Sequence, residues 1–205
     1  LCTAARASGA ESEKLFAIFP CNTYLLTAPN TLCWRDTADN ADSAVYIVEV
    51  FREGLFSGER QRILRRQLRN TNCTSFEAAI KKAHPYSWRV SRQGDADSGA
   101  RYYFQIVSPL EKKRLQQKLD LLMGESQESC QPYSLCIAAT FCYSSRLYYR
   151  ALWYTARIPE PLQSWSLIRE LEERILQEMD LTREQAAWLK TNKGQNMLER
   201  YMSGP

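Results

Sequence analysis

The chain has 205 residues, of which 44% are hydrophobic and 24% are charged, and its formal net charge is +4 at pH 7. This composition excludes a disordered or fibrous protein, and the length is enough to bury a core in one domain or in one domain with an appendage. No apolar run reaches the roughly 20 residues that a membrane-spanning helix needs, because Arg146 and Arg150 interrupt the most apolar stretch.

Short apolar segments between turn residues predict four strands in the N-terminal part of the chain. They cover 14–19, 23–28, 31–35 and 43–51. The last segment is apolar on both faces apart from Glu49, which favours a central position in a sheet.

Two helices are expected after these strands. The first covers 57–69 and the second opens on a capping box, Thr74-Ser75-Phe76-Glu77, and ends before Pro85. Two segments that alternate across a polar loop, 86–90 and 101–107, then predict a β-hairpin.

A third helix has a well-marked start and end. Ser108 suits its N-cap, Pro109 its first position and Glu111 its third. Gly124 marks its C-terminus.

Cysteines at steps of six, namely Cys130, Cys136 and Cys142, follow this helix. Structural zinc sites use thiolates two to four residues apart, and an extended chain separates residues at this step by roughly 20 Å. Neither a shared metal nor a mutual disulfide fits, so we expect no metal and no cofactor. The segment 135–142 instead predicts a buried strand with Cys136 and Cys142 on one face, and 147–156 predicts the strand that returns beside it.

Two amphipathic helices are expected after the break at Pro159-Glu160-Pro161. The first begins near Leu167, where apolar positions recur at steps of three and four, and we expect it to pack on the sheet. The second begins at the capping box of Thr182 and Gln185. Its large side chains lie along an interrupted apolar stripe and favour contact with a protein partner. These side chains are Trp188, Met197, Tyr201 and Met202.

The mixed order of strands, hairpins and helices predicts an α+β fold with a mostly antiparallel sheet, a basic helical insertion and a C-terminal helical pair. We expect residues 1–158 to form the core domain and residues 159–205 to pack on it or extend from it.

Positive charge is concentrated between Ser57 and Lys118, where fourteen Lys and Arg stand against five Asp and Glu. In the helix expected over 57–69, the arginines fall together opposite the apolar side. They are Arg62, Arg65, Arg66 and Arg69, and Lys112, Lys113 and Arg114 add charge on the third helix. Such a stripe suits phosphate backbones, anionic lipid or an acidic partner. The alternative is an ordinary solvated helix face.

Compartment is the least constrained property. The seven cysteines are an odd count, and a chain of this length does not need the dense disulfides of small secreted domains. The sequon Asn72-Cys73-Thr74 is weak support for secretion, because such triplets are common by chance. We therefore expect an intracellular protein, in the nucleus or cytoplasm.

Catalytic motifs are missing from the sequence. The only histidine, His84, has no motif that supplies a nucleophile and an orienting acid, and Asp95 and Asp97 suit a hairpin loop better than a magnesium site. We expect a non-catalytic binding or adaptor subunit of a larger assembly, with a protein partner and with nucleic acid as a candidate ligand. The alternatives are a secreted, glycosylated binding protein or effector, and an enzyme whose scattered site leaves no local motif.

Overall fold

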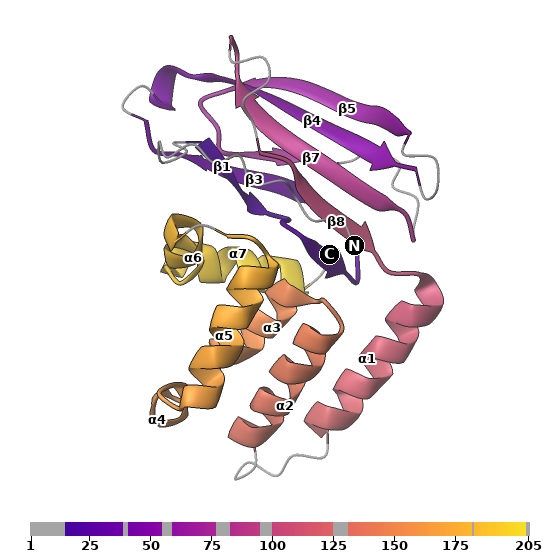
Figure 1. Ribbon diagram of the computed structural model, residues 1–205, viewed down its shortest axis with the longest axis vertical. Coiled ribbons are helices and arrows are strands. Elements are labelled where there is room, and N and C mark those ends of the chain that lie inside the picture. Colours follow the sequence, from indigo (N-terminus) through magenta and orange to yellow (C-terminus); the bar gives the residue numbers. More distant parts are fainter. Residues whose placement is uncertain are drawn as a thin grey trace.

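A computed structural model of the chain describes residues 15–38, 41–54, 59–76, 83–94, 100–124, 131–181 and 183–203. Two β-sheets lie face to face at one side of the molecule, and the helices gather at the other side (Figure 1). Strands and helices are both abundant and are segregated in this way, so the predicted α+β class is confirmed.

The larger sheet has five strands in the order β2-β8-β7-β4-β5. Neighbouring strands are antiparallel except for β2 and β8, which are parallel. The predicted hairpin, now β7 and β8, and the central position of β4 are confirmed. The bounds are β2 (Thr23–Leu25), β4 (Val45–Glu53), β5 (Arg60–Arg69), β7 (Pro85–Arg92) and β8 (Tyr102–Ile106).

The smaller sheet has the order β1-β3-β6 and is antiparallel throughout. Its strands are β1 (Leu15–Phe19), β3 (Thr31–Asp36) and β6 (Cys73–Ser75), and a 3-10 turn, η1 (Ala41–Ser43), precedes β4. In Figure 1 this sheet lies between the larger sheet and the C-terminal helices.

Seven helices are described: α1 (Pro109–Gly124), α2 (Gln131–Ser144), α3 (Tyr148–Thr155), α4 (Glu160–Gln163), α5 (Ser166–Glu178), α6 (Arg183–Leu189) and α7 (Asn192–Ser203). The start of α1 is as predicted, because the backbone N–H of Glu111 donates to Oγ of Ser108 at 3.2 Å. The helix expected from Leu167 is α5. The last predicted helix is instead two helices, α6 and α7. None of the described helices is long and apolar enough to cross a membrane.

The predicted helix over 57–69 is wrong, because β5 pairs with β4 along its length. Ile63 is the extra residue of a β-bulge: Leu64 pairs with Val50 and Arg62 with Phe51. The bulge breaks the two-residue alternation of the strand, and the apolar residues then match a helical period. The start expected for the next helix, at Thr74, is also wrong, since this residue lies in β6. Most of that expected helix falls on 77–82, outside the described residues.

The strands predicted over 135–142 and 147–156 are wrong as well, because these segments form α2 and α3. A short apolar run does not distinguish a buried strand from a buried helix. In α2 the buried residues are spaced as on one face of a helix: Leu135, Ala138, Ala139 and Cys142. Cys136 is half-buried while Cys142 is fully buried, so the expected shared face is lost.

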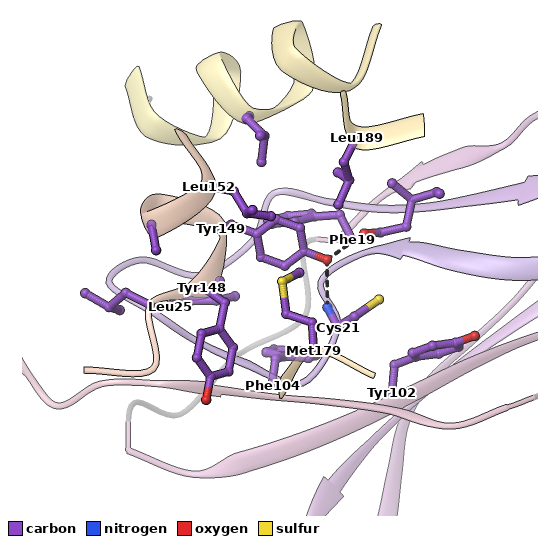
Figure 2. Packing of buried hydrophobic residues seen from close by; sticks show 14 of the residues in the cluster. Phe19, Cys21, Leu25, Tyr102, Phe104, Tyr148, Tyr149, Leu152, Met179 and Leu189 are labelled. Carbon is purple, nitrogen blue, oxygen red and sulfur yellow. Dashed lines mark hydrogen bonds between the residues drawn. The ribbon is translucent and has the colours of Figure 1, made fainter. Parts of the chain in front are cut away.

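The core joins the sandwich to the helices (Figure 2). The hydroxyl of Tyr149 in α3 donates to the carbonyl of Ile18 at 2.6 Å and accepts from the backbone N–H of Cys21 at 3.1 Å. The side chain of Gln185 in α6 donates to the carbonyl of Ala17 in β1. These contacts link α3 and α6 to β1, which makes the C-terminal helices part of the folded core.

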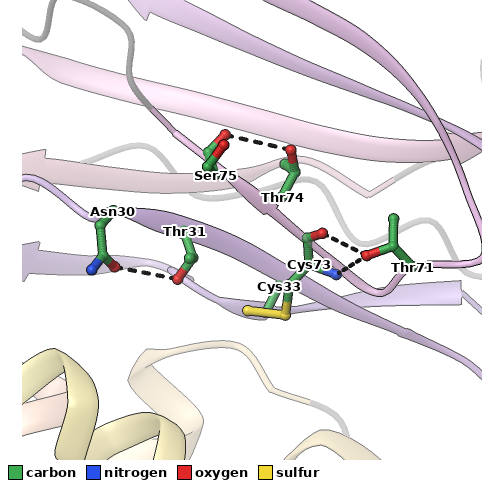
Figure 3. The surroundings of a disulfide bond; sticks show 7 residues. All are labelled: Asn30, Thr31, Cys33, Thr71, Cys73, Thr74 and Ser75. Atoms are coloured by element: carbon green, nitrogen blue, oxygen red, sulfur yellow. Dashed lines mark hydrogen bonds between the residues drawn. A yellow bond between two sulfur atoms is a disulfide. The ribbon is translucent and has the colours of Figure 1, made fainter.

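A disulfide joins Cys33 in β3 to Cys73 in β6 (Figure 3). The two residues are direct partners in the antiparallel register. Cys21, Cys136 and Cys142 are free thiols, and Cys2 and Cys130 lie outside the described residues.

Candidate functional site

The arginines of β5 lie at the edge of the larger sheet, and all except Arg66 are on the face that points away from the core. In β4 the side chains of Tyr46, Val48 and Val50 are buried inside the sandwich. Alternation therefore turns Glu49 and Phe51 to the opposite face. No described element covers this face over β4, β5 and β7 (Figure 1).

The bulge in β5 gathers arginines of odd and even number on the same face. On one side of the bulge Arg65 pairs with Glu49, and on the other side Arg62 pairs with Phe51. Both pairs point outward, because Glu49 and Phe51 do. Arg69 and Arg60, at the two ends of the strand, follow the same alternation as their neighbours.

Interior strands add two more arginines. Arg89 in β7 pairs with Glu49, and Arg101 immediately precedes Tyr102, whose side chain is buried in the sandwich. Both therefore lie on the outward face. We call this surface the arginine face: Arg60, Arg62, Arg65, Arg69, Arg89 and Arg101. Six guanidinium groups stand there against two carboxylates, Glu49 and Glu53, which leaves a surplus of four positive charges.

Glu49 lies at the centre of the arginine face and is only 5% exposed. Its carboxylate accepts from Arg89 at 2.8 Å and from Arg62 at 2.9 Å, and the Arg65 guanidinium lies 3.9 Å away. Burial alone would raise the pKa of Glu49, but the hydrogen bonds from Arg89 and Arg62 outweigh it and hold the pKa below its usual value. Glu49 therefore stays ionised and anchors arginines of β5 and β7.

Phe51 lies between two guanidinium groups. That of Arg101 is 5.1 Å from the ring centroid and that of Arg60 is 5.8 Å from it. Burial and then the nearby Arg60 charge lower the pKa of Arg101. In the described part of the chain Arg101 makes no ion pair, whereas Arg60 is paired with Glu53 at 3.0 Å.

The sequence-predicted basic residues divide among three places. Arg62, Arg65 and Arg69 belong to the arginine face. Arg66 points the other way and donates to the carbonyl of Ser75 at 2.8 Å, so it links β5 to β6.

The third place is α1, which carries Lys112, Lys113 and Arg114. This helix runs away from the end of β8 and does not reach the outward face of β4 and β5 (Figure 1). The arginines expected on a helix over 57–69 and the charges expected on the third helix therefore belong to separate basic regions.

The residues predicted to contact a partner lie on the C-terminal helices. Trp188 in α6 and Met197 in α7 are half-buried and pack against the core. Tyr201 lies in α7, and its side chain is outside the described part.

Sequence reasoning missed Arg60, Arg89 and Arg101 as members of the site. The signal for Arg89 was present, because the predicted hairpin alternates and places Trp88 and Val90 on the opposite side from Arg89. In the same way, the strand predicted over 101–107 places Arg101 on the side opposite the buried Tyr102.

Among the described residues no group of three or more His, Cys, Asp or Glu is arranged to hold a metal ion. No known protein-family model matches this sequence, and no curated protein matches it either.

Proposed function

We propose that the protein is a non-catalytic binding subunit that holds an anionic polymer on the arginine face, with single-stranded nucleic acid as the first candidate. The observation that carries the proposal is the uncompensated charge around Phe51, where Arg101 makes no ion pair within the described residues. Guanidinium groups contact phosphates without reading base identity. The half-exposed ring of Phe51 and the nearby Tyr103 are surfaces on which bases stack.

An arginine-rich edge strand also has a purely structural use, because charge on an edge prevents pairing with another chain. That reason applies to β5 and does not apply to Arg89. Arg89 belongs to β7, an interior strand of the sheet, and Arg101 immediately precedes β8. Their presence on the same face as the β5 arginines supports a binding surface.

The test is fluorescence anisotropy with a labelled oligothymidylate at several salt concentrations. Replacing Arg65 and Arg69 by Gln removes two exposed guanidinium groups. Neither makes a side-chain hydrogen bond to a described residue, and that of Arg65 lies 3.9 Å from the Glu49 carboxylate. The salt dependence of binding is expected to flatten by about 0.7 per lost contact on single strands. The matched control replaces Lys112 and Lys113 by Gln, which changes the net charge equally and is expected to leave the slope unchanged.

Equal losses from both double variants would mean that the protein attracts the strand through its net charge alone. No binding of the unaltered protein at low salt would remove nucleic acid as the ligand of the arginine face.

A second candidate is a secreted binding protein, supported by the Cys33–Cys73 disulfide. Disulfides persist mainly in oxidising compartments. Asn72, in the sequon beside Cys73, is exposed. Mass spectrometry of the protein from its native source distinguishes the two candidates. An oxidised Cys73 with a glycan on Asn72 would favour secretion, and reduced thiols without a glycan would favour the intracellular reading.

A further inference from the structure

A cleft of about 1040 Å³ lies between the smaller sheet and the C-terminal helices. One wall comes from β3 and from the turn between β5 and β6, and the other from α6 and the start of α7. We call it the tryptophan cleft and define it by Trp34, Arg35, Asn70, Asn72, Trp188 and Lys193. None of these residues belongs to the arginine face.

We propose that the tryptophan cleft binds an acidic oligosaccharide, one whose sugar rings carry carboxylates as uronic acids do. The half-buried indole of Trp188 offers an apolar ring together with a polar N–H, which suits the mixed surface of a pyranose ring. Side-chain amides donate and accept hydrogen bonds, as sugar hydroxyls do. A cleft with aromatic walls and a few convergent polar groups is the usual form of a small-ligand site.

The polar groups of the cleft are largely unused by the chain itself. Within the described residues the side chains of Asn70 and Asn72 make no hydrogen bond. The indole N–H of Trp34, a residue only 2% exposed, is buried without an acceptor in the part of the chain that the structure describes. Buried donors are nearly always satisfied, so this orphan donor is one that an ordered water, or a ligand that shifts the wall, completes.

The free charges of the cleft are positive. Asp36 also lines the cleft, but its carboxylate is held by Arg92 and by the Tyr46 hydroxyl, the latter at 3.0 Å. Arg35 and Lys193 are exposed and make no ion pair with any described residue. A ligand carboxylate would therefore find two cations with no competing acid, which favours a uronate over a neutral sugar.

Both walls are fixed before any ligand arrives. The disulfide lies beside the first wall, and the backbone N–H of Trp34 donates to the carbonyl of Asn72 at 2.8 Å. Figure 3 shows the disulfide between Cys33 and Cys73, which are the sequence neighbours of Trp34 and Asn72. Such rigidity reduces the entropy that binding must overcome.

In the second wall, Gly194 allows α7 to begin directly against α6. A Cβ at this position would lie 2.5 Å from the carbonyl oxygen of Trp188. This close approach sets Lys193 beside Trp188 in the cleft.

The experiment is a calorimetric titration with tetragalacturonate and, as the neutral match, its methyl ester. The acid is expected to bind with a Kd below about 1 mM, and the ester at least about tenfold more weakly. Lys193→Gln should weaken binding of the acid and leave binding of the ester unchanged. Trp188→Ala should abolish binding of both.

Controls separate the cleft from other surfaces and from loss of fold. Trp165→Ala removes a tryptophan that is 44% exposed and lies outside the cleft. This variant should bind the acid as tightly as the unaltered protein does. Thermal melts check that Trp188→Ala is folded, and Lys193→Gln provides a test that does not remove buried area.

The proposal is overturned if neither sugar binds at a concentration 10-fold above the expected Kd, or if Trp188→Ala binds as the unaltered protein does. Loss of sugar binding in the Arg65→Gln, Arg69→Gln variant would also overturn it, because the sugar would then lie on the arginine face. None of these results depends on the nucleic-acid titration, so the two proposals fail independently.

Discussion

Replacing Glu49 by Gln perturbs the arginine face at its centre. The carboxylate is almost fully buried and holds Arg89 and Arg62 by direct hydrogen bonds. The Arg89 side chain is 21% exposed, whereas that of Arg62 is 52% exposed and screened by water. Loss of the charged hydrogen bond to Arg89 costs about 2 kcal/mol, and the exposed partners add about 1 kcal/mol.

The expected destabilisation is therefore about 3 kcal/mol, which corresponds to a fall in Tm of roughly 6–12 °C for a chain of this size. Thermal unfolding followed by circular dichroism at pH 7 measures it. The control is Glu170→Gln, which breaks an exposed pair with Arg174 on α5 and is expected to cost less than about 1 kcal/mol.

The pH dependence gives this prediction a second readout. Because the pKa of Glu49 is lowered in the folded protein, its contribution is complete above the unfolded pKa, near 4.5, and is lost as the pH falls through the folded pKa. The Tm difference between the two proteins should therefore shrink below pH 4.5. A difference that stays constant down to pH 3, or a variant as stable as the unaltered protein at pH 7, would refute the role assigned to Glu49.

Three further predictions concern the rest of the molecule. Cys73→Ala removes a bridge to Cys33 that closes a 40-residue separation, and it should lower the free energy of unfolding by about 4 kcal/mol in denaturant melts; an unchanged midpoint would contradict this. Burial raises the pKa of Cys142 to about 12, so iodoacetamide should alkylate it far more slowly than the half-buried Cys136 in the native protein, and equal rates would contradict the burial. Deleting all residues after Leu181 should abolish cooperative unfolding, because the deleted helices place Leu189 and Leu198 in the core. A truncated protein that still unfolds cooperatively would show that these helices are an appendage.

Sequence patterns correctly predicted the secondary structure of those segments in which the local signals and the tertiary packing favour the same element. The caps of α1 and the alternation of β7 and β8 are two such cases, because local chemistry and tertiary packing favour the same structure there. β5 differs, since its arginines and leucines suit a helix and the bulge at Ile63 conceals the strand period. Only pairing with β4, which a local pattern does not contain, decides its structure.

The strands predicted over 135–142 and 147–156, where the structure has α2 and α3, are wrong for a related reason. Their apolar runs fit a buried strand or a buried helix equally well. Pro132, in the first turn of α2, was the available helix signal. The candidate site shows the same limits. Arg62, Arg65 and Arg69 were selected for their charge and for a helical face that does not form, whereas the alternation of the predicted hairpin carried the signal for Arg89 and Arg101.

Hydrogen–deuterium exchange of the whole protein, with and without an oligothymidylate at low salt, tests most directly that the arginine face is the binding surface. β5 is an edge strand whose outer amides are open to solvent, so binding should slow exchange there. Binding on the arginine face should slow exchange along β5, β4 and β7 and leave α1 unchanged. Protection confined to α1, or no protection anywhere while the strand is bound, would contradict it.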